Sequence, residues 1–253
     1  MMNRLQTALL ISLISISAVS WFISKDRPDM MMAMMTYDPI AISLFTLGWT
    51  AGMAAMMFPA ISPMVLLYNR LIKTGSGETV GIEKSYPLKM TLFVACYLGV
   101  WALTGITLLL LWSIPMNAFL TEIKRNQLYM IYGIILIIAG AYQFSPLKTK
   151  CLGYCESPMS FFMRRWRSGT IGSIKMGTYH GLYCLGCCWP YFLLMVALGW
   201  MNLLWMGLFA GIIFGEKVWS RGILVARTAG IGFMVLGLIA LFMPDADILL
   251  KII

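Results

Sequence analysis

One uninterrupted apolar stretch, residues 178–215, constrains this chain more than any other feature. Its 38 residues contain only His180 as an ionisable side chain besides cysteine and tyrosine. A helix needs about 20 mostly apolar residues to cross the hydrocarbon core of a bilayer. The stretch is therefore long enough for two crossings, joined by a tight turn near residues 200–202. We expect an integral membrane protein.

Hydropathy predicts about seven membrane-spanning helices, and no separate soluble domain fits between them. The expected spans are residues 8–23, 40–67, 90–114, 128–144, 179–199, 203–215 and 228–243. Composition agrees, because 60% of the residues are hydrophobic and only 11% are charged, against roughly 25% charged in soluble domains. We expect an all-α fold, a polytopic transmembrane helix bundle that forms a single integral membrane domain over residues 1–253.

The basic residues predict the orientation of this bundle, because cytoplasmic loops carry an excess of lysine and arginine. The N-terminus and the connections 70–89, 148–175 and 217–227 hold 14 of the 19 basic residues, and the opposite side holds 5. We therefore expect a cytoplasmic N-terminus and a multi-pass location in the bacterial inner (plasma) membrane. Topology accounts for the net charge of +9, so we expect no nucleic-acid partner.

The first expected span also has some features of a signal peptide. Its small residues Ala18, Val19 and Ser20 are similar to a signal-peptidase site. Trp21 and Phe22 follow at once, without a polar region, so we expect the span to be retained.

The densest group of metal-ligating side chains lies in the fifth expected span. His180, Cys184, Cys187 and Cys188 lie within about 100° of one another around a helix. Pro190 follows and bends or loosens the helix just beyond them. Ionisable groups within a span usually face the bundle interior and mark a functional path. The alternative interpretation is three ordinary buried cysteines beside a hydrogen-bonded histidine.

A second pair of thiols precedes this span. Cys151 and Cys155 lie in the basic connection, and their spacing places both on one face of a helical turn. The expected topology puts five of the six cysteines near the reducing cytoplasmic face, where disulfides rarely form and thiolates are free to bind metal. Cys96 stands alone in the third span, and we interpret it as a packing residue.

Methionine is concentrated toward the opposite, outer side. Met53, Met56 and Met57 share one face of the second span, although such a stripe is often core filler. Residues 30–35 add five methionines in the connection before it. Thioethers prefer Cu(I) and need no deprotonation, so methionine outside and cysteine inside suit a Cu(I) route. Glu216, followed by Lys217, is interpreted as a salt-bridged structural anchor.

These motifs resemble a bacterial family of predicted metal-binding integral membrane proteins, formerly a domain of unknown function, in which some members are labelled copper chaperones. The similar segments are residues 53–60 with Pro63, 142–148, Cys151 to Cys155, 157–158, 177–189, 199–206 and 216–217. The resemblance implies metal binding, with candidate ligands Met53, Met56, Met57, Cys151, Cys155, His180, Cys184, Cys187 and Cys188.

Cu(I) handling is the function that this pattern favours, as transport or as chaperone delivery to a copper enzyme. The expected partners are the lipid bilayer, the metal ion and a copper-dependent membrane enzyme or soluble copper carrier. We do not expect an enzyme, although a thiol–disulfide oxidoreductase using Cys184 and Cys187 with a quinone is an alternative. Further alternatives are a structural zinc or Fe–S site and a non-catalytic subunit of a copper membrane enzyme.

Overall fold

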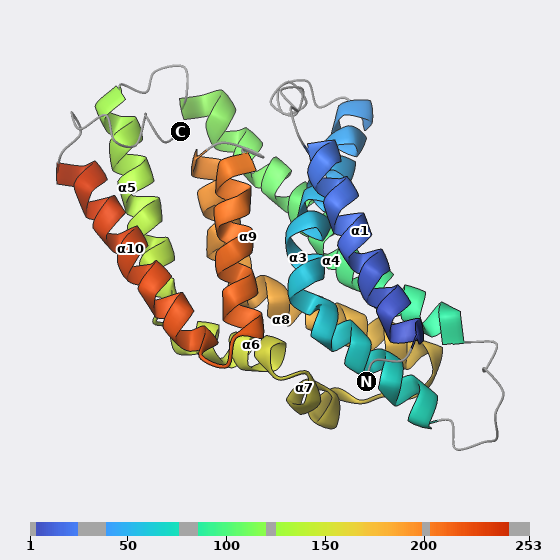
Figure 1. The fold of residues 1–253 in the computed structure, drawn as a ribbon. Coiled ribbons are helices and arrows are strands. Elements are labelled where there is room, and N and C mark those ends of the chain that lie inside the picture. The colour runs from blue at the N-terminus through green and yellow to red at the C-terminus, as the bar shows by residue number, and fades with distance from the viewer. Residues whose placement is uncertain (1–3, 25–38, 76–85, 120–124, 199–202, 243–253) are drawn as a thin grey trace.

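The computed structural model describes residues 4–24, 39–75, 86–119, 125–198 and 203–242, which form a bundle of helices (Figure 1). The helices are α1 (Arg4–Ser24), α3 (Pro39–Gly75), α4 (Tyr86–Phe119), α5 (Arg125–Tyr142), α6 (Pro146–Glu156), α7 (Pro158–Arg165), α8 (Gly169–Leu198), α9 (Leu203–Val218) and α10 (Gly222–Phe242). These ranges contain no strand. The predicted all-α class is confirmed.

Each of the seven expected spans falls on its own helix, but fewer helices meet the requirements for crossing a membrane. Pro39–Lys73, Pro87–Leu111 and Gly222–Phe242 are long and apolar enough. The bent pair of α5 and α6, with 63° between its helices, makes a fourth if it is one span. α9 has only 16 residues, fewer than the about 20 that a crossing needs. The described residues therefore contain three or four candidate spans, and the count of seven stays a prediction.

Glycines bring the outer helices α5 and α10 into close contact. A Cβ added at Gly140 would lie 2.6 Å from the carbonyl oxygen of Gly230. One added at Gly237 would lie 2.8 Å from the carbonyl oxygen of Gly133. Small residues at a crossing allow two backbones to approach and gain van der Waals contact. α4 with α8 and α1 with α3 are the other extensively packed pairs (Figure 1).

The connection between α5 and α8 is helical where the sequence suggested a basic loop. α6 starts at an N-cap, Ser145, whose hydroxyl accepts from the backbone N–H of Lys148 at 3.1 Å, and Pro146 opens the helix. α6 packs on α8 and α9 and thereby brings Lys148, Cys151 and Cys155 into the buried interior. The expected helical turn that carries Cys151 and Cys155 is therefore part of a helix in which both cysteines and Lys148 are buried.

Candidate functional site

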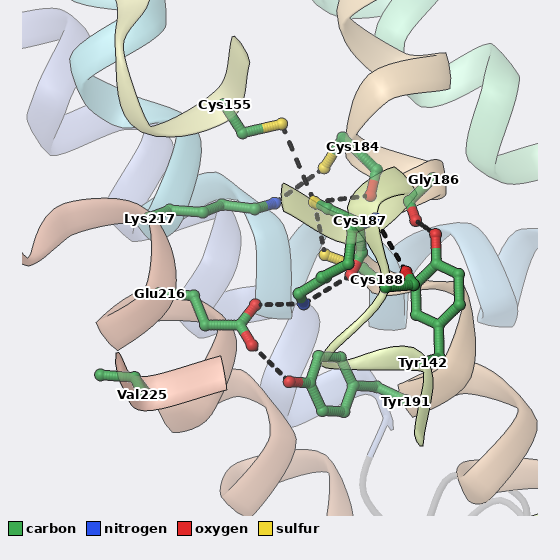
Figure 2. A network of polar contacts seen from close by, with 12 residues as sticks. Tyr142, Cys155, Cys184, Gly186, Cys187, Cys188, Tyr191, Glu216, Lys217 and Val225 are labelled. Atoms are coloured by element: carbon green, nitrogen blue, oxygen red, sulfur yellow. Dashed lines mark hydrogen bonds and ion pairs between the residues drawn. The ribbon is translucent and has the colours of Figure 1, made fainter. Parts of the chain in front are cut away.

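Four thiols from two helices gather in the bundle interior. The Sγ atom of Cys187 on α8 lies 3.3 Å from that of Cys188 and 3.8 Å from that of Cys155 on α6. Cys184 lies one turn earlier on α8, and all four side chains are at most 6% exposed (Figure 2). Two sulfurs bound to one zinc ion lie about 3.8 Å apart, and the sulfurs of Cys187 and Cys155 have this separation.

A thioether of α3 reaches the same cluster. The Sδ atom of Met57 lies 3.9 Å from Sγ of Cys184. Met53 and Met56 lie earlier on the same helix and are at most 2% exposed. Met57 and Cys184 are 127 positions apart in the sequence, and the contact between their sulfur atoms joins the methionine group to the cysteine group.

The two sulfur groups have the same spacing along their helices, a signal that our sequence analysis missed. In α3 the order is Met53-Ala-Ala-Met56-Met57-Phe58-Pro59, and in α8 it is Cys184-Leu-Gly-Cys187-Cys188-Trp189-Pro190. Each helix therefore presents three sulfur atoms, then an aromatic ring, and then a proline. A proline removes the hydrogen bond to the carbonyl four residues earlier, so each of these continuous helices lacks one backbone hydrogen bond directly beside its sulfur atoms.

Hydroxyl groups from neighbouring helices restore the hydrogen bonds that these prolines remove. Pro190 frees the carbonyl of Gly186, which accepts from the Tyr142 hydroxyl at 2.5 Å (Figure 2). Pro59 frees the carbonyl of Ala55, which accepts from the Ser17 hydroxyl at 2.5 Å. Side chains satisfy freed carbonyls in this way where water is excluded, as in transmembrane helices.

A buried ion pair lies against the thiols. The Lys148 ammonium donates to Glu216 Oε2 at 2.7 Å and to the carbonyl oxygen of Cys187 at 2.7 Å. The other carboxylate oxygen of Glu216 accepts from the Tyr191 hydroxyl (Figure 2). Both charged side chains are 0% exposed. The predicted anchor at Glu216 exists, but its partner is Lys148 of α6 and not the adjacent Lys217.

Lys217 points to the sulfur atoms instead. Its ammonium lies 2.8 Å from Sγ of Cys184 and 3.6 Å from Sδ of Met57. The Tyr97 hydroxyl of α4 lies 3.1 Å from the same Cys184 sulfur. Consecutive helix residues point in different directions, which explains why Glu216 and Lys217 have separate partners. Nothing in the local sequence indicates that Lys217 contacts the thiols, because its position at the start of the basic connection 217–227 is typical of a loop charge.

His180 occupies a separate aromatic environment. Its ring centroid lies 5.4 Å from that of Tyr97, 5.5 Å from that of Phe161 and 6.3 Å from that of Phe93. The side chain is 1% exposed, and neither ring nitrogen has a hydrogen-bond partner among the described residues. A buried polar group without a partner costs free energy, so His180 is available to a ligand but is not joined to the thiols by a hydrogen bond.

The structure thus unites only part of the predicted ligand set. Cys155, Cys184, Cys187, Cys188 and Met57 form one contact group. Cys151 lies at the edge of this group, with its sulfur 2.8 Å from where a Cβ on Gly186 would stand. In the part of the chain that the structure describes, no set of three or more histidine, cysteine or acidic side chains is arranged to hold a metal ion. The predicted outer methionines, residues 30–35, lie outside the described residues.

A family model described as PpoB2, copper chaperone, matches residues 46–240. The chain belongs to this family. The match includes both sulfur groups, the Lys148–Glu216 pair and Lys217, and it leaves out α1. No curated protein and no solved structure matches the chain.

Proposed function

We propose that the protein carries Cu(I) within a membrane and passes it between methionine and cysteine ligands, as a transporter or as a chaperone for a copper enzyme. Family membership supports copper as the cargo. The observation that carries the proposal is the 3.9 Å contact between Met57 Sδ and Cys184 Sγ. It joins a thioether group on one helix to a thiol group on another, and both donor types are soft ligands that favour Cu(I).

The proposed transfer is a ligand exchange without a redox step. Copper enters as Cu(I) on the neutral thioethers of Met53, Met56 and Met57. It then bonds to the sulfur of Cys184, which is a thiolate paired with the Lys217 ammonium, while its bond to Met57 breaks, and it stays monovalent throughout. Thiolates bind Cu(I) more tightly than thioethers do, so the cysteine group is the site of higher affinity. Cys155, Cys187 and Cys188 supply the further sulfur ligands, and His180 and Cys151 remain candidate ligands at its border.

We also propose that the whole chain, residues 1–253, forms one membrane domain with seven spans and a cytoplasmic N-terminus in the bacterial inner membrane. The three or four apolar helices of spanning length support membrane insertion. Two of the basic residues counted toward the cytoplasmic side, Lys148 and Lys217, are buried at the site. Without them the count is still twelve against five, so the proposed orientation is unchanged.

Metal analysis of the detergent-purified protein tests this proposal. We expect copper to co-purify, and Cu(I) titration against a bathocuproine chelator to show tight binding. Replacing Cys184 and Cys187 together with serine should abolish that binding while leaving membrane insertion intact. Cys96→Ser is the matched control, because this half-buried thiol lies on α4 outside the cluster. Stoichiometric copper in the double variant would overturn the proposed site, and zinc or iron in place of copper would favour a structural metal site instead.

A further inference from the structure

The buried side chains around the thiols carry one uncompensated positive charge, and this charge affects which metal ion the site prefers. Lys148 and Glu216 form a neutral pair at 2.7 Å. Lys217 is 4% exposed, and within the described residues no carboxylate lies at ion-pair distance from its ammonium. Its nearest polar atoms are the sulfurs of Cys184 and Met57, at 2.8 and 3.6 Å. The site therefore holds one buried positive charge that only thiolate can neutralise.

We infer that Lys217 is a specificity-determining residue that favours a monovalent ion over a divalent one at the thiol cluster. This inference rests on the proposed function. Cu(I) with two thiolates forms a complex of charge −1, which the Lys217 ammonium brings to zero. For any given number of thiolates, Zn(II) leaves the loaded site one unit of charge more positive than Cu(I) does. An uncompensated buried charge is strongly destabilising, and the ammonium therefore penalises the divalent ion.

The location of Lys217 makes this effect large. Its ammonium lies beside the Cys184 sulfur (Figure 2) and also contacts Met57. In such an interior, charges interact more strongly than in water. The adjacent ion pair contributes little to the balance, because Lys148 and Glu216 cancel. The Tyr97 hydroxyl, 3.1 Å from the Cys184 sulfur, adds a hydrogen bond but no charge. The selectivity thus depends on one side chain.

The test compares the affinities of purified full-length protein for Cu(I), Ag(I) and Zn(II), each measured against a chromophoric chelator. Lys217→Met should lower the ratio of Cu(I) to Zn(II) affinity by at least about tenfold. Lys217→Arg, which keeps the charge, should stay within about threefold of the unaltered protein. The ratio of Cu(I) to Ag(I) affinity should not change in either variant, because both ions are monovalent. Circular dichroism of each variant, measured before the titrations, identifies a general loss of structure.

Two further results decide the inference. A Cu(I) to Zn(II) ratio that is unchanged in Lys217→Met would overturn it, as would an Arg variant that behaves like the Met variant. If Lys217→Met does not fold, Lys217→Gln provides the same charge change with a polar side chain. Failure of the unaltered protein to bind Cu(I) at all would overturn the proposed function itself. Binding of copper without charge-dependent selectivity would overturn only the role of Lys217.

Discussion

The hydroxyl of Tyr142 donates a hydrogen bond to the backbone carbonyl of Gly186 at 2.5 Å. That carbonyl has no helical partner, since the residue four positions later is Pro190. Tyr142 is the last residue of α5, so the bond connects the end of this helix to the segment of α8 that lacks a backbone hydrogen bond. The thiols of Cys187 and Cys188 lie between the freed carbonyl and the proline, and the bond holds the helix segment that carries them.

Tyr142→Phe should therefore lower the free energy of unfolding by about 1–3 kcal/mol, because the freed carbonyl of Gly186 is left without a donor. Denaturant unfolding in detergent, followed by circular dichroism, measures this. Tyr132→Phe on the same helix is the control. In a Pro190→Ala background the helix regains its own donor, so the cost of Tyr142→Phe should largely disappear. An equal cost in both backgrounds would contradict the assignment.

Ser17 of α1 has the corresponding role for α3. Its hydroxyl donates to the Ala55 carbonyl, which Pro59 leaves without a backbone donor. We predict that Ser17→Ala also costs about 1–3 kcal/mol of unfolding free energy. Ser12→Ala is a suitable comparison, because its exposed hydroxyl bonds only within α1, to the Leu9 carbonyl. The same unfolding experiment applies. If Ser12→Ala destabilised the protein as much as Ser17→Ala does, the loss would not come from the freed carbonyl.

Substitutions of Lys148 and Glu216, which form a buried ion pair, should have strongly non-additive effects on the free energy of unfolding. Lys148→Met leaves the Glu216 carboxylate uncompensated and should cost about 3–5 kcal/mol. Adding Glu216→Gln removes that charge, so the double variant should be more stable than Lys148→Met alone. A double-mutant cycle measured by denaturant unfolding gives the coupling energy. A coupling energy near zero would show that the two side chains are not an ion pair in the folded protein.

Met57 should control the rate of copper transfer more than the total amount bound. Met57→Leu keeps the volume but removes the thioether beside Cys184. We expect Cu(I) exchange between the protein and an added chelator to slow by about tenfold, equivalent to about 1.4 kcal/mol. Stopped-flow absorbance measures this rate. Met64→Leu, a buried methionine later in α3, should exchange at the unaltered rate. Equal rates in all three proteins would exclude Met57 as the transfer ligand.

Local patterns in the sequence were sufficient to predict most of the helices. Each of the seven expected apolar stretches lies on its own helix, because hydropathy and helix propensity act over neighbouring residues. The connection of residues 145–177 was misinterpreted as a loop. Its helix start, Ser145 followed by Pro146, is a recognisable signal, but only the turn from Cys151 to Cys155 was predicted as helical.

The site was less predictable, since its decisive contacts join distant parts of the chain. The stripe of Cys184, Cys187 and Cys188 follows from helical spacing, and all three are buried as expected. The pairing of Lys148 with Glu216 spans 68 positions, and that of Lys217 with Cys184 spans 33. No local pattern determines which buried lysine meets the carboxylate and which meets the thiol, because that choice depends on how α6 and α9 pack against α8.

The most direct test of the central claim is X-ray absorption at the copper edge of the Cu(I)-loaded, full-length protein. We predict a first coordination shell of sulfur only, with two or three sulfur atoms, and one fewer sulfur atom in the Cys184→Ser variant. A shell dominated by nitrogen or oxygen, or a spectrum that Cys184→Ser leaves unchanged, would contradict copper binding at the contact between Met57 and the α8 thiols.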